Sequence, residues 1–430
     1  MRPRWMETTE AQPWRSRPLV AEKGTTPGLQ VTETVGQKWE GVGGCFNELG
    51  WHALSVLSPS ERAKALKSLF DPATGCRLSI GRLPIGASDY ALEWYSHNET
   101  DGDFRMKHFS VERDRRYLLP YIKAALGIQP DLKLFASPWS PPTWLKDPRA
   151  YNYGTLVWDR KHLAAYALYF VKFVQAYARQ GVRIEQIHPQ NEVVADQKFP
   201  SCLWTGAQLR DFIRDYLGPA FARAGLDCEI WLGTLNTDDY NGFPLTVLSD
   251  PRANRYVAGV GFQWAGKGAI QRTHAAWPEK RLMQTENECG DGLNTWAYAH
   301  YVFGLMQHYI TNGANAYVYW NMVLPEGGLS TWGWRQNSMM TVDIKRRQMT
   351  CRPEFHVMRH FGQFVEPGAH RMGLGGTWAG NAVAFRNPGG STVIVMHNPF
   401  GGACPVTLSS GAAAWRAELQ SMSFNTFVLP

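Results

Sequence analysis

Short apolar runs alternate with amphipathic stretches along most of the chain, from about residue 41 onward. Eight of these runs are four to eight residues long and rich in Ile, Val, Leu and aromatic side chains. Such continuous apolar runs are typical of strands that are buried on both faces of a sheet. The expected strands are Gly41–Phe46, Arg77–Pro84, Leu132–Ser137, Ile184–Pro189, Glu229–Thr234, Val257–Gln263, Leu282–Thr285 and Ala316–Trp320.

The stretches between these strands carry helical patterns. Residues Ser58–Phe70 begin with capping residues and place Ala63, Leu66 and Phe70 on one side. Further helical patterns cover His162–Gln180, Gly206–Gly225 and Thr295–Gly313. Eight strand–helix units predict parallel strands that close into a (β/α)₈ barrel. A doubly wound open sheet is the alternative, but no strand is followed by a G-x-G-x-x-G turn.

The pattern changes after about Pro367, where short strands are separated by Asn-Pro-Gly-Gly and Gly-Gly turns. This change indicates a small antiparallel β-sandwich. The segment Leu19–Glu40 also alternates and is expected to add strands to it. The predicted fold is therefore an α/β TIM barrel with a packed antiparallel β-sandwich side domain. Its expected parts are an N-terminal segment over residues 1–40, the barrel over 41–366 and the sandwich over 367–430.

Two of the expected strands lead directly to a glutamate: Glu192 follows the fourth strand and Glu286 the seventh. A carboxylate at the end of a buried strand is costly, because charge resists leaving water. The active site of a (β/α)₈ barrel lies at the carboxyl ends of its strands, so both side chains are expected in one mouth. Two facing carboxylates are what glycoside hydrolysis uses, one as proton donor and the other as nucleophile or base.

Other residues beside the same strand ends suit a bound sugar. They are Arg82 and Asp89 after the second strand, Trp139 after the third, Asn191 beside Glu192 and Trp320 at the end of the eighth. Carboxylate and amide groups bind hydroxyls, indole faces match the apolar faces of a pyranose ring, and an arginine keeps a nearby carboxylate ionised. Each residue also has a structural interpretation, as an ion-pair partner or a core side chain. Glu288 competes with Glu286 for the second role, although it lies in a loop.

The amino-acid composition indicates a globular protein and argues against a nucleic-acid-binding or metal-binding protein. The chain has 430 residues, 44% of them hydrophobic, which suffices for a large core. Its net charge is 44 − 37 = +7, but no basic stripe gathers this charge, so nucleic-acid binding is not expected. Seven scattered cysteines lack any ligand spacing, so mostly free thiols and no metal or organic cofactor are expected.

Compartment and assembly are less constrained by the sequence. No run of about 18 apolar residues is present, so stable membrane insertion is not expected. The N-terminus lacks the apolar segment of a signal peptide, which favours the cytoplasm. Secretion or a periplasmic location is the alternative if an export signal is missing from this sequence. The oligomeric state stays open.

Six motifs, in order along nearly the whole chain, resemble glycoside hydrolase family 30, the family of acid β-glucosylceramidases and β-1,6-glucanases. They are Gly43-Gly-Cys-Phe-Asn-Glu-Leu-Gly-Trp51, Arg82-Leu-Pro-Ile-Gly-Ala-Ser-Asp-Tyr90, Ala136-Ser-Pro-Trp-Ser-Pro-Pro-Thr-Trp-Leu-Lys146, Pro189-Gln-Asn-Glu192, Met283-Gln-Thr-Glu286 and Tyr319-Trp-Asn-Met-Val-Leu-Pro-Glu-Gly-Gly328. The resemblance implies a barrel with a sandwich built from both termini and hydrolysis with retention of anomeric configuration. It also implies that Glu192 is the acid/base and Glu286 the nucleophile.

By the same resemblance, five residues match positions that line the subsite of the sugar whose bond is cleaved. They are Arg82, Asp89, Trp139, Asn191 and Trp320. One departure concerns Phe262-Gln-Trp-Ala265, which stands where glucosylceramidase-like members carry a His-Trp-Tyr run. Trp264 is kept as a substrate-binding residue, but Gln263 cannot titrate and Ala265 lacks the aromatic ring. This departure favours the β-1,6-glucanase-like branch.

The predicted function is a retaining β-glycoside hydrolase that acts on a β-glucan or β-glucoside by double displacement. For retention, the two carboxyl groups are expected about 5–5.5 Å apart. An exo-acting β-glucosidase or glucosylceramidase is the first alternative. A catalytically dead carbohydrate-binding protein is a second, but it would lack one of the glutamates, and both Glu192 and Glu286 are present.

Overall fold

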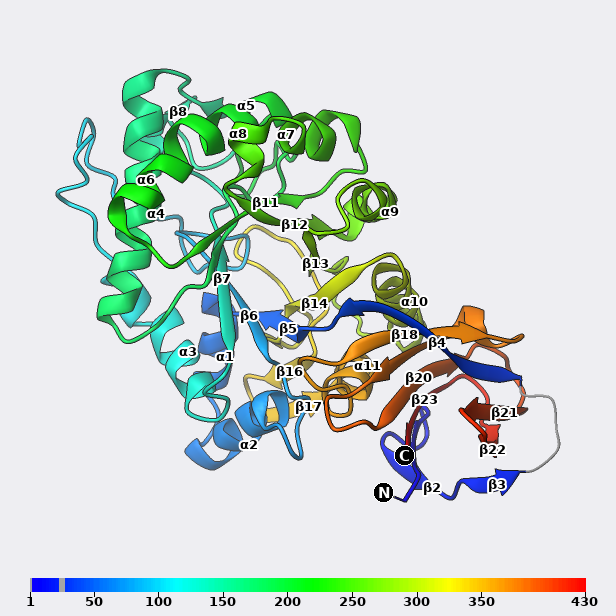
Figure 1. Ribbon diagram of the computed structural model, residues 1–430. Helices are drawn as coiled ribbons and strands as arrows, with labels where there is room; N and C mark the ends of the chain where they lie inside the picture. The colour runs from blue at the N-terminus through cyan, green and yellow to red at the C-terminus, as the bar shows by residue number, and fades with distance from the viewer. Residues whose placement is uncertain (1, 23–27) are drawn as a thin grey trace.

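The computed structural model describes residues 2–22 and 28–430, and the eight expected strands form a closed parallel barrel (Figure 1). Around the barrel the strand order is β10-β11-β12-β13-β14-β5-β6-β7. The strands are β5 (Gly41–Cys45), β6 (Ile80–Pro84), β7 (Lys133–Ser137), β10 (Gln186–Ile187), β11 (Glu229–Leu235), β12 (Val257–Gln263), β13 (Arg281–Glu286) and β14 (Ala314–Asn321). The barrel prediction is confirmed, and the open-sheet alternative is excluded because β14 pairs with β5 and closes the ring.

Helices follow the barrel strands and cover the outside of the ring. They are α1 (Glu48–Ser55), α2 (Pro59–Phe70), α3 (Leu118–Leu126), α4 (Arg160–Arg179), α5 (Gly206–Phe212), α6 (Gly218–Ala224), α7 (Thr246–Leu248), α8 (Pro251–Asn254), α9 (Lys267–Ala276), α10 (Trp296–Thr311) and α11 (Pro353–Gly362). The residue that precedes a helix explains where several of these helices begin, because its side chain caps free backbone N–H groups. Ser58 accepts from the Glu61 backbone N–H at the start of α2, and Asp159 accepts from two backbone N–H groups at the start of α4.

Strands from both ends of the chain form one mainly antiparallel sheet with the order β2-β1-β23-β20-β19-β18-β4-β21-β22-β3. In Figure 1 the blue N-terminal strands lie among the orange and red C-terminal ones. The strands are β1 (Arg4–Thr8), β2 (Arg15–Arg17), β3 (Val20–Glu22), β4 (Leu29–Lys38), β18 (His370–Gly375), β19 (Ala382–Arg386), β20 (Thr392–Asn398), β21 (Cys404–Ser410), β22 (Ala413–Leu419) and β23 (Ser423–Leu429). One pairing, β4 with β21, is parallel instead of antiparallel.

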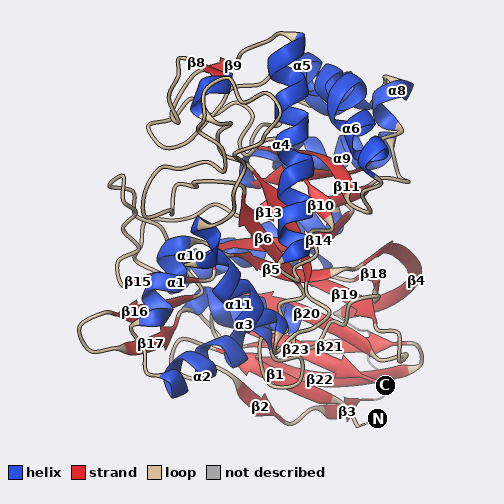
Figure 2. Ribbon diagram, turned by 90° about the vertical axis from the view of Figure 1, so that its left-hand side faces the viewer, coloured by secondary structure: helices blue, strands red, loops and turns tan. Residues whose placement is uncertain are grey.

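The loops that follow the strands contain short strands and helical turns, and loops fill most of the upper left of Figure 2. The small strands are β8 (Lys146–Asp147), β9 (Thr155–Leu156), β15 (Val323–Pro325), β16 (Met340–Asp343) and β17 (Gln348–Cys351). The short helical turns are η1 (Arg113–Arg115), η2 (Thr143–Leu145), η3 (Ile213–Leu217), η4 (Asn241–Leu245), η5 (Trp264–Gly266) and η6 (Ala379–Asn381). The long connection after β14 matters most for function, because it returns over the barrel mouth before α11 begins.

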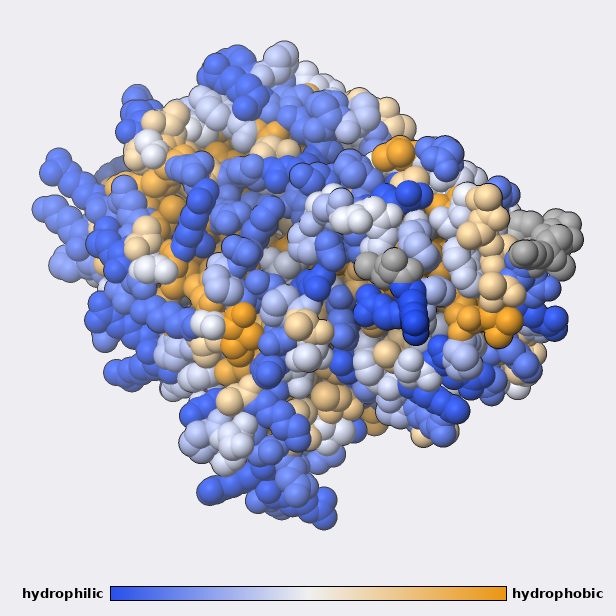
Figure 3. Space-filling view, turned by 60° about the horizontal axis from the view of Figure 1, so that its bottom comes forward, coloured by the Kyte–Doolittle hydropathy of each residue, from blue (hydrophilic) through white to orange (hydrophobic). Residues whose placement is uncertain are grey.

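The surface is mainly hydrophilic on the face shown in Figure 3, and the cysteines are not joined in disulfides. Hydrophilic residues cover most of the face in Figure 3, and the apolar residues form smaller patches between them. Each of the seven cysteines, all within the described ranges, has a free thiol. Among residues 2–22 and 28–430, no helix is both long and apolar enough to span a membrane.

Candidate active site

A buried arginine organises the polar residues at the carboxyl ends of the strands. Arg82, near the end of β6, is completely buried and forms an ion pair with the carboxylate of Glu286. Its Nη2 donates to Asn191 Oδ1 at 2.5 Å and to Ser137 Oγ at 3.1 Å, and its Nη1 donates to the Thr285 carbonyl at 3.3 Å. One guanidinium on β6 therefore links residues from three other strand ends, which fixes their relative positions.

Two tryptophans lie against this guanidinium. The Cζ of Arg82 lies 4.6 Å from the ring centroid of Trp139 and 5.2 Å from that of Trp320. The two indole rings are themselves 5.2 Å apart. Both tryptophans are buried, so they keep water from the arginine and strengthen its attraction to the neighbouring carboxylate.

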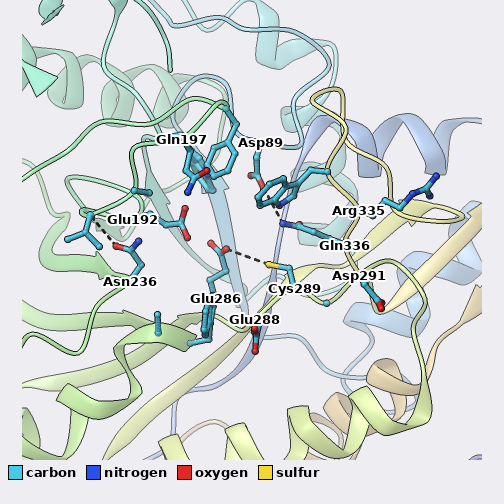
Figure 4. A pocket seen from close by; sticks show the side chains of 18 of the residues that line it. Asp89, Glu192, Gln197, Asn236, Glu286, Glu288, Cys289, Asp291, Arg335 and Gln336 are labelled. Atoms are coloured by element: carbon cyan, nitrogen blue, oxygen red, sulfur yellow. Dashed lines mark hydrogen bonds between the residues drawn. The ribbon is translucent and has the colours of Figure 1, made fainter. Parts of the chain in front are cut away.

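The two oxygens of Glu286 have different surroundings. Oε2 receives the hydrogen bond from Arg82 and a second one from Gln263 Nε2 at 3.0 Å. Gln263 also donates to Asn191 Oδ1 at 2.8 Å. Oε1 lies 3.8 Å from the thiol of Cys289 and faces the pocket (Figure 4). The side chain is thus held firmly by one oxygen, and its other oxygen is presented to a ligand.

Glu192 reaches the same pocket from a special backbone conformation. The chain leaves the ladder after Ile187, and Glu192 adopts a φ of +48°, in the left-handed region that a residue with a Cβ seldom occupies. Its carboxylate points toward that of Glu286 in Figure 4. The charge of Arg82 is paired with Glu286 and not with Glu192, so the two carboxylates are electrostatically unequal.

This inequality appears in the pKa values of three of the carboxyl groups that line the pocket. Burial raises the pKa of Glu192 well above its usual value, and the charge of Glu286 raises it further. Burial also raises the pKa of Glu286, but Arg82 opposes the rise. The pKa of Asp89 is raised to about 8, mainly by burial and then by the charge of Glu286. Glu286 is therefore the group of the three that Arg82 favours most as an anion.

The pocket between these groups has a volume of about 720 Å³. Its lining residues are Asp89, Trp139, Glu192, Val194, Ala195, Gln197, Phe199, Asn236, Trp264, Ala265, Glu286, Glu288, Cys289, Gly290, Asp291, Gly333, Trp334, Arg335 and Gln336. This size and the mixture of indole rings with convergent polar groups are typical of a small-molecule or oligomer site. Among the described residues, no cluster of three or more His, Cys, Asp and Glu side chains could hold a metal ion.

Of the eight residues predicted from the sequence, five line this pocket and three lie behind it. The lining residues are Asp89, Trp139, Glu192, Trp264 and Glu286. Arg82, Asn191 and Trp320 are almost completely buried: Arg82 pairs with Glu286, Trp320 packs against Trp139, and Asn191 accepts from Arg82. Direct contact of these three with a substrate stays a prediction.

Sequence reasoning missed the contribution of the connection after β14, which supplies Trp334 and Gln336 to the wall. Gln336 Nε2 donates to Asp89 Oδ2 at 3.4 Å. Asp89 Oδ1 is buried and has no hydrogen-bond partner among the described residues, so it is available to a ligand hydroxyl. No periodic pattern or motif marked this loop beyond its first residues.

Comparisons with known proteins agree with this geometry. Residues 39–365 match the glycosyl hydrolase family 30 TIM-barrel domain, and residues 368–427 match the glycosyl hydrolase family 30 beta sandwich domain. Lysosomal acid glucosylceramidase of Mus musculus is 31% identical over 424 residues, which cover 90% of this chain and 80% of that protein. Endo-1,6-beta-D-glucanase of Neurospora crassa is 28% identical over 418 residues, which cover 92% and 86%.

A solved structure supports the fold separately. SrfJ from Salmonella typhimurium superposes with a TM-score of 0.90 and 24% identity, over 100% of this chain and 99% of that chain. Together the barrel, the paired carboxylates and these matches define an O-glycosyl hydrolase. The chain belongs to glycoside hydrolase family 30, as the sequence motifs predicted.

Proposed function

We propose that the protein is a retaining β-glycoside hydrolase that cleaves β-1,6-linked glucan, with Glu286 as nucleophile and Glu192 as acid/base. The unequal environment of the two carboxylates carries this proposal. Arg82 and Gln263 hold Glu286 and favour its charged form, whereas burial and the charge of Glu286 raise the pKa of Glu192. A nucleophile has to be ionised and a general acid protonated before the first step, which matches these environments.

In the first step, Oε1 of Glu286 attacks the anomeric carbon of the bound sugar. The bond from that carbon to the leaving oxygen breaks, and Glu192 gives its proton to this oxygen. Oε1 is the oxygen that faces the pocket, while Oε2 stays bonded to Arg82 and Gln263. Trp139 stacks over Arg82 on one side and forms part of the pocket wall, so it excludes water beside the reacting carbon.

In the second step, water replaces the departed group. Esterification removes the negative charge of Glu286, which is one of the causes of the raised pKa of Glu192. The pKa of Glu192 then falls, so the carboxylate left by the first step is a base that takes a proton from water. Water attacks the anomeric carbon, the bond to Glu286 breaks, and the sugar leaves with its original configuration.

Two features support a glucan as the substrate. The rim of the pocket carries polar side chains, which suit the hydroxyls of a neighbouring sugar; they are Gln197, Asn236, Asp291 and Arg335. Gln263 and Ala265 replace the titratable and aromatic residues of glucosylceramidase-like members, and Ala265 lies in the pocket lining. The similarity to the Neurospora crassa endo-1,6-beta-D-glucanase is in line with this choice.

Glucosylceramide hydrolysis is the second candidate. It is favoured by the 31% identity to the mouse lysosomal glucosylceramidase and by the apolar side chain of Val194, which is 44% exposed and lines the pocket. An exo-acting β-glucosidase would share this site, because the reacting carboxylates are the same.

Product analysis on β-1,6-glucan, glucosylceramide and an aryl β-glucoside, run in parallel with the purified enzyme, tests the proposal. We expect the highest kcat/KM on β-1,6-glucan, with the newly formed reducing end first seen as the β-anomer by NMR. A first product in the α-configuration would disprove retention. Preferential hydrolysis of glucosylceramide would move the assignment to the second candidate.

A further inference from the structure

Aromatic rings continue from the pocket wall to the outer surface of the protein. Trp334 and Phe199 both line the pocket and meet edge to face, with ring centroids 5.7 Å apart. Two residues before Trp334, Trp332 stacks on Trp94 at 5.9 Å with an interplanar angle of 9°. Trp94 also lies 5.9 Å from Tyr151. We call Trp94, Trp332 and Tyr151 the aromatic platform.

The platform is joined to the pocket through the backbone. The backbone N–H of Ser201, two residues after Phe199, donates to the Tyr151 carbonyl at 3.0 Å. Trp332 and Trp334 are separated only by Gly333, which itself lines the pocket. The platform therefore lies next to the pocket wall along both segments.

Hydrogen bonds hold the platform in place. Thr331 Oγ1 donates to the Ala91 carbonyl at 2.9 Å, and the Tyr90 hydroxyl donates to the Gly328 carbonyl at 2.7 Å. Both bonds dock the connection after β14 on the loop after β6. Such a preformed surface binds a ligand without the loss of conformational freedom that a mobile loop would bring.

The exposure and surroundings of the platform indicate its ligand. Trp94 is 38% exposed, a large apolar ring that faces water beside a pocket. Charged side chains lie on both the platform side and the pocket side: Glu93, which precedes Trp94 in the sequence, is 76% exposed in its side chain, and Lys198 Nζ lies 5.3 Å from the centroid of Trp334 in the pocket wall. Flat apolar rings bordered by hydrogen-bonding groups suit a pyranose, whose faces are apolar and whose edges carry hydroxyls. A saturated acyl chain, by contrast, offers no hydrogen-bonding group to these charged neighbours.

We propose that the aromatic platform is a further sugar-binding subsite, which holds a glucosyl residue of the same chain outside the bond that is cleaved. The proposal rests on the β-1,6-glucanase function and deepens it, since it makes the substrate a chain of several sugars. The enzyme then gains binding energy from remote units, and this gain is used at the reacting carbon.

Chain-length dependence tests the subsite. The ratio of kcat/KM for a β-1,6-linked gluco-octaose to kcat/KM for the disaccharide is measured for wild type and for Trp94→Ala. Loss of one stacking surface is expected to lower this ratio about 10-fold. Trp94→Phe keeps an aromatic face and is expected to restore most of it. Trp158→Ala is the matched control, because Trp158 is 39% exposed but contacts Trp204 instead of the platform.

The outcomes separate this inference from the proposed function. If wild type leaves β-1,6-glucan intact, the proposed function fails and the subsite fails with it. If wild type cleaves the glucan but Trp94→Ala keeps the wild-type ratio, or Trp158→Ala lowers it equally, only the subsite is disproved. A loss on long-chain alkyl β-glucosides without a loss on the octaose would assign the platform to an acyl chain and also overturn the proposal.

Discussion

The lower and upper halves of the barrel interior come from the same strands but differ in chemistry. The lower half is an apolar layer made of Ile80, Phe135, Trp231, Met283, Ala316 and Val318. The upper half is a polar layer, and a step of two residues along a strand leads from one to the other. On β6 this step runs from Ile80 to Arg82, and on β7 from Phe135 to Ser137. Successive inward positions of a strand thus serve packing first and the site second.

His188 lies between the two layers and shows how sharply they are divided. Its ring lies 4.8 Å from that of Phe135 and stacks on Trp231 at 5.6 Å. Neither ring nitrogen has a hydrogen-bond partner among the described residues. Burial, together with the charge of Arg82, lowers the pKa of His188 well below its usual value. The histidine is therefore neutral, and it separates the apolar layer from the charge above it.

The largest expected effect is on activity and belongs to the polar layer. Glu286→Gln removes the nucleophile but keeps an oxygen that accepts from Arg82, so the protein should stay folded. We expect kcat to fall by on the order of 10⁴-fold or more. Initial rates on an aryl β-glucoside measure the loss, and circular dichroism checks the fold. Glu288→Gln is the control, because Glu288 lines the same pocket but does not pair with Arg82; a greater loss in this variant would transfer the role to Glu288.

The next effect is on stability and belongs to the apolar layer. Phe135→Ala leaves a cavity beneath His188 and is expected to lower the free energy of unfolding by about 3–5 kcal/mol. Urea denaturation measures this change. At low temperature, where the variant is folded, its kcat should stay within about 10-fold of wild type, because the polar layer keeps its own hydrogen bonds. A drop in kcat like that of Glu286→Gln would show that the two layers are not independent.

Most of the barrel could be predicted from the sequence, because strands buried on both faces are recognisable as apolar runs. All eight predicted runs overlap strands of the closed ring. The fourth was predicted as Ile184–Pro189, but only Gln186–Ile187 remains in the ladder. Pro189 has no backbone N–H to donate, and the chain turns from there toward Glu192 with its positive φ. Local sequence reveals where a strand lies but not how early it leaves the sheet.

The candidate site was predictable where its residues follow a strand and not where a long loop supplies them. Glu192 and Glu286 could be found because each stands after an apolar run. Gln336 could not, since it meets Asp89 across 247 residues of sequence and follows no strand directly. The sequence also does not reveal which strand-end side chains reach the pocket. Trp320 stands at a strand end like Trp139, yet only Trp139 lines the pocket. Which strand-end side chain is covered by another depends on packing across the barrel.

The smallest expected effect is on the free energy of unfolding, and it shows how far a buried carboxylate of the polar layer destabilises the folded protein. Because burial and Glu286 raise the pKa of Asp89 to about 8, the folded protein binds a proton there that the unfolded chain has lost above about pH 4. A raised folded-state pKa gives stability that is complete at low pH and is lost as pH rises toward 8. Asp89→Asn has no proton to lose, so it should match wild type near pH 4 and exceed it increasingly from pH 5 to 8.

We expect this gain to reach on the order of 2 kcal/mol at pH 8, because water in the pocket screens part of the charge. Urea denaturation of both proteins between pH 4 and 8 measures it, and contributions from the histidines cancel in the difference. Asp343→Asn is the contrasting control: backbone N–H groups lower the pKa of Asp343, and the stability that a lowered pKa gives is already complete above about pH 4, so this variant should be less stable than wild type by a nearly constant amount between pH 4 and 8. A pH-independent difference for Asp89→Asn would mean that Asp89 is ionised in the folded protein at no cost. In that case only Glu192 and Glu286 could make the polar layer destabilising, in contrast to the stabilising apolar layer.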